Sequence, residues 1–218
     1  PGRRRHTCAH ELGHHAFGHG LRHDRLVGDA DTEGWQPEEF MANRFGVALL
    51  MPKLAVESAI MRRGWSAAAL TAEQAFVIAQ DLGVGYGNFV GHLERTLGLL
   101  NSSQAEQLRR LGRRLPRLRA TIAGFQVDHD IVVADRHWGA RSIDIEVGDV
   151  ILIPDGGAPR GGCVSFIDDT VPHLRAVAAG EGSVSLGAAL TQVAIRVSRR
   201  SFTGLARYRH LEDPDDAS

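Results

Sequence analysis

The sequence predicts an α+β multidomain protein, in which a mainly helical part is followed by an all-β, sandwich-like or barrel-like part. Up to about residue 119, apolar residues recur every three or four positions, as on one face of a helix. Beyond Ala120, short β-branched runs are separated by glycine and proline, which is typical of strands and turns. The chain has 218 residues, 43% of them hydrophobic, which is enough for two small domains. We expect a first domain over 1–100, an Arg/Leu-rich linker helix over 101–119, a β domain over 120–211 and an acidic disordered tail over 212–218.

Composition excludes several classes of protein. Lys plus Arg number 25 and Asp plus Glu 26, so no global positive charge favours direct nucleic-acid binding. The apolar runs are far shorter than the roughly 20 residues of a membrane span. Two cysteines are too few for a disulfide framework, and the opening Pro-Gly-Arg-Arg-Arg has no apolar signal segment. These features predict a cytoplasmic protein.

Histidines are concentrated at the start of the chain, where six of the 11 lie within the first 23 residues. Positions 10 to 14 read His-Glu-Leu-Gly-His, the H-E-x-x-H pattern. On a helix, His10 and His14 project from one face onto one metal ion, and Glu11 flanks the same ion. The alternative interpretation is a solvated, His-rich helix.

The residues around this motif favour a helix packed against a core. Ala9, Leu12, Ala16 and Phe17 recur at helical spacing, and Thr7 can serve as the N-cap. On this helix His15 and His19 are expected to lie off the metal-facing side. Cys8 is expected to lie off that side as well and to be a small buried hydrophobe.

A catalytic zinc site takes three protein ligands, so a third ligand is needed. The extended pattern with a third histidine requires glycine at 17 and histidine at 20, whereas the chain has Phe17 and Gly20. The remaining source is a carboxylate from a second helix, which the sequence predicts from Pro37 to Met51, with Pro52 ending it.

On this second helix Glu39, Asn43 and Gly46 share one face. Glu39 can ligate the metal, Asn43 can hydrogen-bond a ligand, and Gly46 allows the two helices to approach closely. Glu38 points about 100° away and is the weaker candidate. Without the histidine motif, the two glutamates would simply be first-turn carboxylates favoured by the helix dipole.

Together these segments resemble the ImmA/IrrE family of metallo-endopeptidases. The resemblance rests on RHTCAHELGH at 5–14, EFMANRF at 39–45, LLMP at 49–52, and the helices of 78–84 and 93–100, so it covers about residues 1–100. Gly85 stands where serine is expected in the family. Family members usually have a helix and a few strands before the H-E-x-x-H helix, so we expect that the chain lacks part of its native N-terminus.

The resemblance implies a zincin-like peptidase core that binds Zn²⁺ through His10, His14 and Glu39. It assigns Glu11 as the general base that takes a proton from a metal-activated water and returns it to the leaving amine. The oxyanion stabiliser is not identified by the motifs, and His23, Tyr86 and His92 are candidates that are each as well explained as surface or packing residues. The substrate class implied is a helix-turn-helix repressor, which would link the protein to transcription regulation and stress responses.

The rest of the chain predicts further elements. Residues 53–100 predict two or three helices separated at Gly83, Gly85 and Gly87. Leucines and arginines interleave from residue 102 to 119, and Pro116 is expected to end or kink that helix. A basic helix can contact nucleic acid, but a solvated helix that packs its leucines on a neighbouring domain explains the pattern better.

Seven short strands are expected beyond residue 120. They are Ile131–Ala134, Ser142–Val147, Val150–Ile153, Cys163–Ile167, Ser183–Leu186, Val193–Ser198 and Leu205–Tyr208. We interpret this β domain as an interaction or regulatory module, and Cys163 within it as a structural thiol.

Two functional hypotheses follow. The first is a zinc endopeptidase joined to a β module that helps select or restrain a protein substrate. The second is a catalytically inactive or structural metal-binding protein in which the β module carries the function. The intact Glu11 favours the first, because a structural metal site has no need of that carboxylate.

Overall fold

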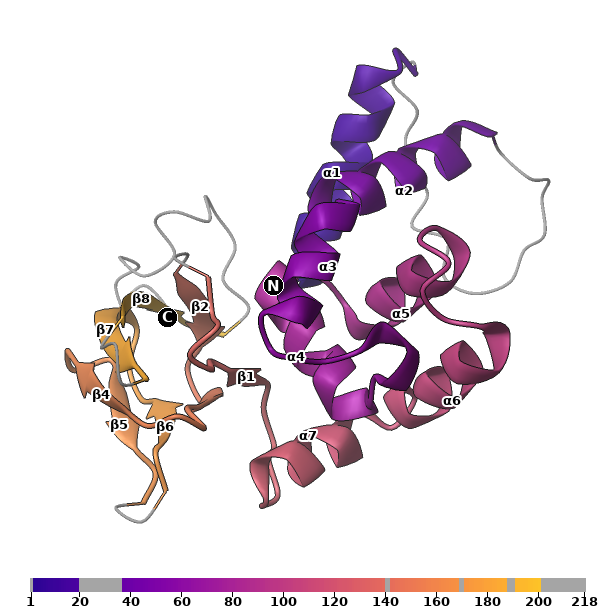
Figure 1. Cartoon of the computed structure of the whole chain (residues 1–218). Helices are drawn as coiled ribbons and strands as arrows, with labels where there is room; N and C mark the ends of the chain where they lie inside the picture. The colour runs from indigo at the N-terminus through magenta and orange to yellow at the C-terminus, as the bar shows by residue number, and fades with distance from the viewer. Residues whose placement is uncertain (1, 20–36, 140–141, 169–170, 188–190, 201–218) are drawn as a thin grey trace.

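The computed structural model describes residues 2–19, 37–139, 142–168, 171–187 and 191–200. Figure 1 shows the helices gathered on one side of the molecule and two small sheets on the other, with α7 and β1 leading from one to the other. Helices therefore occupy the first part and strands the second, which confirms the expected α+β fold class.

The helical part contains seven α-helices and one 3₁₀ turn among the described residues. They are α1 (Gly2–Ala16), α2 (Pro37–Leu50), α3 (Lys53–Met61), η1 (Ala67–Ala69), α4 (Ala72–Leu82), α5 (Tyr86–Arg95), α6 (Ser102–Gly112) and α7 (Leu115–Ala123). Local sequence explains several boundaries. Thr71 and Asn101 form capping boxes with the glutamines three residues later, and Gly83 ends α4 with a φ of 68°.

Two helical expectations are wrong. Helix α1 begins at Gly2, so Thr7 lies inside it and does not cap it, because the arginines of 3–5 are good helix formers that extend the helix backwards. The expected linker helix over 101–119 is two helices, α6 and α7. Pro116 lies in the first turn of α7, where its missing N–H is tolerated, so it begins a helix and does not end one.

Within the part of the chain that the structure describes, the strands form two four-stranded mixed sheets. Their bounds are β1 (Ile131–Val133), β2 (Ile143–Glu146), β3 (Val150–Leu152), β4 (Gly157–Arg160), β5 (Val164–Phe166), β6 (His173–Ala176), β7 (Gly180–Leu186) and β8 (Thr191–Ser198). The first sheet has the order β1-β3-β6-β5 and the second β2-β8-β7-β4. The pairs β1–β3 and β2–β8 are parallel and the others antiparallel. Strands β4 and β6 were not expected, and the expected strand Leu205–Tyr208 lies outside the described residues.

The first sheet contributes to two hydrophobic cores. Side chains alternate along a strand, and in β3 Val150 and Leu152 join the helical core while Ile151 packs with the second sheet. All three residues of β3 are buried. The uninterrupted apolar run of this strand therefore reflects burial on both faces, and the strands form a sandwich whose first sheet also covers the helices.

Buried polar contacts join the two parts. The Arg63 guanidinium, 1% exposed, forms ion pairs with Asp81 of α4 and with Asp135, which follows β1. The Gln80 side chain donates to the Ile131 carbonyl and accepts from the Val133 N–H at 3.0 Å. It therefore provides hydrogen-bond partners for two backbone groups of β1, which is an edge strand of its sheet. None of the described helices is long and apolar enough to cross a membrane.

Candidate metal centre

Helices α1 and α2 pack through small residues. Gly13 lies against Ala42, and one turn earlier on α1 the backbone of Ala9 and His10 lies against Gly46, so the helices run in opposite directions. A Cβ on Gly13 would lie 2.9 Å from the Ala42 Cα, and a Cβ on Gly46 would lie 3.1 Å from the His10 nitrogen. Side chains at these two positions would push the helices apart, so glycine permits the close approach expected at Gly46.

This contact corrects the expected core face of α1. Leu12 and Phe17 are 47% and 45% exposed, and Ala16 and Cys8 are exposed too, because the helix packs through Ala9 and Gly13. The expectation of a buried Cys8 is therefore wrong.

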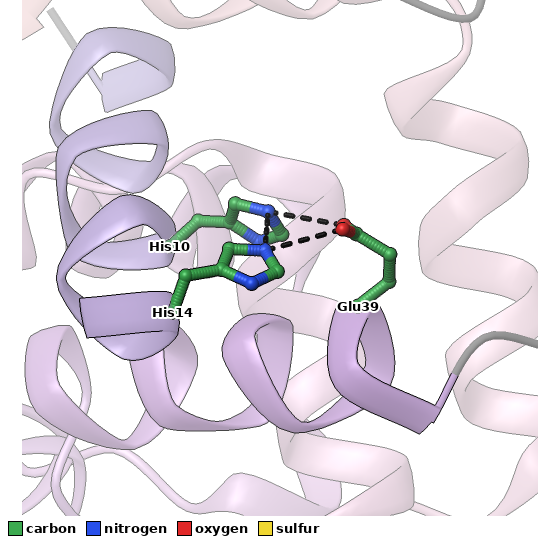
Figure 2. A group of neighbouring side chains, drawn as sticks. All are labelled: His10, His14 and Glu39. Atoms are coloured by element: carbon green, nitrogen blue, oxygen red, sulfur yellow. Dashed lines mark hydrogen bonds and ion pairs between the residues drawn. The ribbon is translucent and has the colours of Figure 1, made fainter. Parts of the chain in front are cut away.

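Three potential ligands converge between the two helices. His10 and His14 project from α1 and Glu39 from the first turn of α2 (Figure 2). The two Nε2 atoms are 3.0 Å apart; His10 Nε2 is 3.2 Å from Glu39 Oε2, and His14 Nε2 is 3.2 Å from Glu39 Oε1. All three ligand atoms lie within 4.8 Å of one another, and the site is partly buried. This group can hold a metal ion.

The protonation chemistry of the group also fits a cation. His10 Nδ1 lies 3.1 Å from Asn43 Oδ1, and in the tautomer in which Nδ1 donates to this oxygen, Nε2 has a lone pair that can bind a metal. That lone pair faces the Glu39 carboxylate and the other imidazole. A divalent cation satisfies such a set of converging acceptors.

His19 contacts His14, although the sequence predicts that it lies off the metal-facing side. Helix α1 ends at Ala16 and the chain turns at Gly18, which has a φ of 66°. The turn brings His19 Nδ1 to 3.0 Å from His14 Nδ1, and the His19 ring stacks on Phe17. The sequence signal for this contact is Gly18, a glycine just beyond a helix end, which favours a left-handed turn.

The remaining candidate residues lie elsewhere. Glu11 is exposed on α1, one position after His10. Tyr86 is buried, donates to the Leu108 carbonyl at 3.0 Å, and its pKa is raised to about 12, mainly by burial and secondly by Glu73. His92 is buried against the Met51 carbonyl at 2.8 Å, and its pKa is lowered mainly by burial. Both residues have structural roles in the helical core, and His23 lies outside the described residues.

Comparison with known proteins relates the N-terminal part of the chain to a peptidase family. Residues 1–90 match the model of the peptidase family M78, described as the IrrE N-terminal-like domain. No curated protein and no solved structure matches the chain. The match contains both metal-centre helices and supports a metallopeptidase related to the ImmA/IrrE family. It does not extend to the strands, which start at residue 131.

Proposed function

We propose that this protein is a zinc-dependent endopeptidase, with His10, His14 and Glu39 as metal ligands and Glu11 as general base. The observation that carries the proposal is the convergence of two imidazoles and a carboxylate in a region that matches a peptidase family. Two histidines and one glutamate are a ligand set found in catalytic zinc sites, which keep a further position open for water or substrate.

The spacing of the potential ligand atoms is compatible with zinc. Bonds of about 2.0–2.1 Å in a tetrahedron put neighbouring ligand atoms about 3.3 Å apart. The two Nε2 atoms are 3.0 Å apart, and His10 and His14 each lie 3.2 Å from a different oxygen of Glu39. The imidazole separation and both carboxylate contacts are therefore close to the distance that a tetrahedral zinc ion requires.

The ligand rings are oriented by neighbouring side chains. Asn43 Oδ1 is positioned to accept from His10 Nδ1, and His19 is positioned to accept from His14 Nδ1. Such partners fix the tautomer that directs Nε2 at the metal. They would therefore reduce the reorganisation that accompanies metal binding.

Glu11 performs the proton transfers in the proposed reaction. When bound, the zinc ion supplies Lewis-acid chemistry, which polarises the scissile carbonyl and lowers the pKa of water. Glu11 accepts a proton from the attacking water and delivers it to the amine nitrogen as the peptide bond breaks. Its exposed position on α1 leaves the carboxylate accessible to water and to a peptide.

The substrate we propose is a protein, and specifically a helix-turn-helix repressor whose cleavage changes transcription in a stress response. This step rests on the family resemblance of the N-terminal region. A repressor substrate also implies that the protein acts in the cytoplasm. We assign the β part to selecting or restraining that substrate.

Elemental analysis of the purified full chain tests the metal site. We expect about one zinc per chain, lost in His10→Ala and Glu39→Gln but kept in Glu11→Gln. His15→Ala is the matched control, because His15 is exposed on the same helix and belongs to no ligand pair. A wild-type chain that stays metal-free after refolding with zinc would exclude the zinc site.

Peptide-bond cleavage tests the enzyme separately. Zinc-loaded wild type should cleave a co-expressed helix-turn-helix repressor, and Glu11→Gln should bind zinc and leave the repressor intact. Zinc-loaded wild type that cleaves neither a repressor nor an unfolded protein would favour the structural metal-binding alternative.

A further inference from the structure

A cavity of about 490 Å³ lies between the helices and the sheets, and none of the proposed metal ligands lines it. Its volume falls within the range of small-molecule sites, about 300–1,000 Å³. Apolar side chains from α4, α7, both sheets and the connection between β1 and β2 form much of the wall; they include Phe76, Leu115, Ile131, Ile143 and, from that connection, Trp138. These residues suit the apolar body of a small organic molecule.

Most charges at the cavity are already paired. Arg196 forms a two-pronged ion pair with Asp144, through Nε at 2.7 Å and Nη2 at 3.0 Å, and Arg119 pairs with Asp130. The carboxylate of Asp149 accepts backbone N–H bonds from Asp130 and Glu146. These charged side chains stabilise the wall of the cavity. Because they already bind one another or the backbone, they are less available to pair with a charged ligand.

Arg5 differs from the other charged residues at the cavity. Within the described part of the chain it forms no ion pair, and its guanidinium lies against Gly83, the residue that ends α4. The guanidinium occupies the space that a Cβ at Gly83 would take. The cavity therefore combines an apolar wall with one cation that is available to an anionic group.

We propose that this cavity binds a small amphipathic organic molecule with one anionic group, whose apolar body occupies the space between helices and sheets and whose anion pairs with Arg5. A carboxylate or sulfonate fits the planar guanidinium through two parallel N–H bonds. A polyphosphate would need several free cations, and among the described residues the cavity offers one.

Arg5 lies on α1, the helix that also carries His10 and His14. Arg5 precedes His10 by five residues on α1, which is about 7.5 Å along the helix axis. A ligand held by Arg5 would therefore contact the helix that carries two of the proposed metal ligands.

The probe for this site is 8-anilinonaphthalene-1-sulfonate, whose aromatic body carries one sulfonate and whose fluorescence rises out of water. Its neutral counterpart is N-phenyl-1-naphthylamine, which lacks the sulfonate. Titration of the folded full chain should show saturable binding of the sulfonate at one site per chain. The readout does not involve peptide cleavage, so this proposal and the peptidase proposal can fail independently.

Two variants distinguish the cavity from other surfaces. Gly85 lines the cavity, has a φ of −73°, and a Cβ added there meets no atom within 4 Å, so Gly85→Trp fills space without strain in the backbone. Gly87→Trp is the matched control, because a Cβ at Gly87 also meets nothing within 4 Å and Gly87 does not line the cavity. We expect Gly85→Trp to weaken binding of both probes by at least about tenfold and Gly87→Trp to leave it unchanged.

Charge reversal tests the role of Arg5. We expect Arg5→Glu to weaken sulfonate binding by about tenfold or more, the loss of one charge-assisted contact, and to change binding of the neutral probe less than about twofold. Arg117→Glu, an exposed arginine of α7 outside the cavity, is the control. Unchanged sulfonate binding in Gly85→Trp would place the probe elsewhere and overturn the proposal. An equal effect of Arg5→Glu on both probes would show that Arg5 does not pair with the anionic group of the ligand.

Discussion

Gly46 of α2 lies directly against the backbone of His10 in α1, and this contact sets the separation of the two helices that supply the metal ligands. A Cβ on Gly46 would lie 3.1 Å from the His10 nitrogen and 3.2 Å from the Ala9 carbonyl carbon, closer than side chains normally approach a backbone. Glu39 lies two turns earlier on α2 and reaches both imidazoles from there. The distance from Glu39 to the histidines therefore depends on a residue that is not itself a ligand.

Substitution of Gly46 should weaken metal binding by separating the helices. We expect Gly46→Val to lower the free energy of unfolding by about 1–3 kcal/mol through overpacking and to reduce zinc affinity. Chemical denaturation and competition with a zinc chelator measure the two effects. Ala48→Val, at an exposed position of the same helix, should change neither. Wild-type zinc affinity in Gly46→Val would show that the ligands tolerate a change in helix separation.

His19 should affect zinc affinity through His14. His19→Phe removes the ring nitrogen that faces His14 Nδ1 at 3.0 Å but keeps a ring that can stack on Phe17. Loss of such a partner typically lowers metal affinity about 10- to 100-fold, and we expect an effect in this range. His15→Phe on the same helix should bind zinc like wild type, and equal affinities in the two variants would contradict the positioning role of His19.

The candidate ligands could be found from sequence because their geometry is local. Two histidines four residues apart share a helix face wherever the helix lies, and the same periodicity places Glu39 and Asn43 together. His19 was missed because its position depends on where α1 ends and how the chain turns at Gly18. The exposed Leu12 was misjudged because helical spacing shows which residues share a face, and not whether small residues on a neighbouring face make the closer contact.

The fold class and most of the described strands were likewise accessible, but β4 and β6 were not. Strands with alternating β-branched residues, such as Ile143–Glu146, stand out from their own sequence. The residues of β4, Gly157–Arg160, contain glycine and proline and resemble a loop. They form a strand because β7 pairs with them, and that pairing is not visible in a window of neighbouring residues.

Tyr86 should make stability fall at high pH. Burial raises the pKa of Tyr86 from 10.0 to about 12, so the folded protein keeps the phenol neutral where the unfolded chain ionises. The folded state therefore binds more protons, and the contribution is complete below pH 10 and declines as the pH rises towards 12. We expect wild type to lose about 2 kcal/mol more than Tyr86→Phe between these pH values, measured by urea unfolding. Parallel pH profiles for the two proteins would contradict the buried, neutral phenol.

Arg63 should be essential for holding the β part against the helices. Its guanidinium donates two hydrogen bonds to Asp135, at 2.7 and 2.9 Å, and one to Asp81 at 3.1 Å, and all three side chains are largely shielded from solvent. Because Arg63→Met leaves Asp135 without its cation, we expect the free energy of unfolding to fall by about 3–5 kcal/mol. Arg62→Met is the matched control, since the Arg62 side chain is 37% exposed and its loss leaves Asp81 paired with Arg63. We expect that control to cost less than about 1 kcal/mol. Equal losses in the two variants, measured by urea unfolding, would show that Arg63 contributes no more than an ordinary surface ion pair.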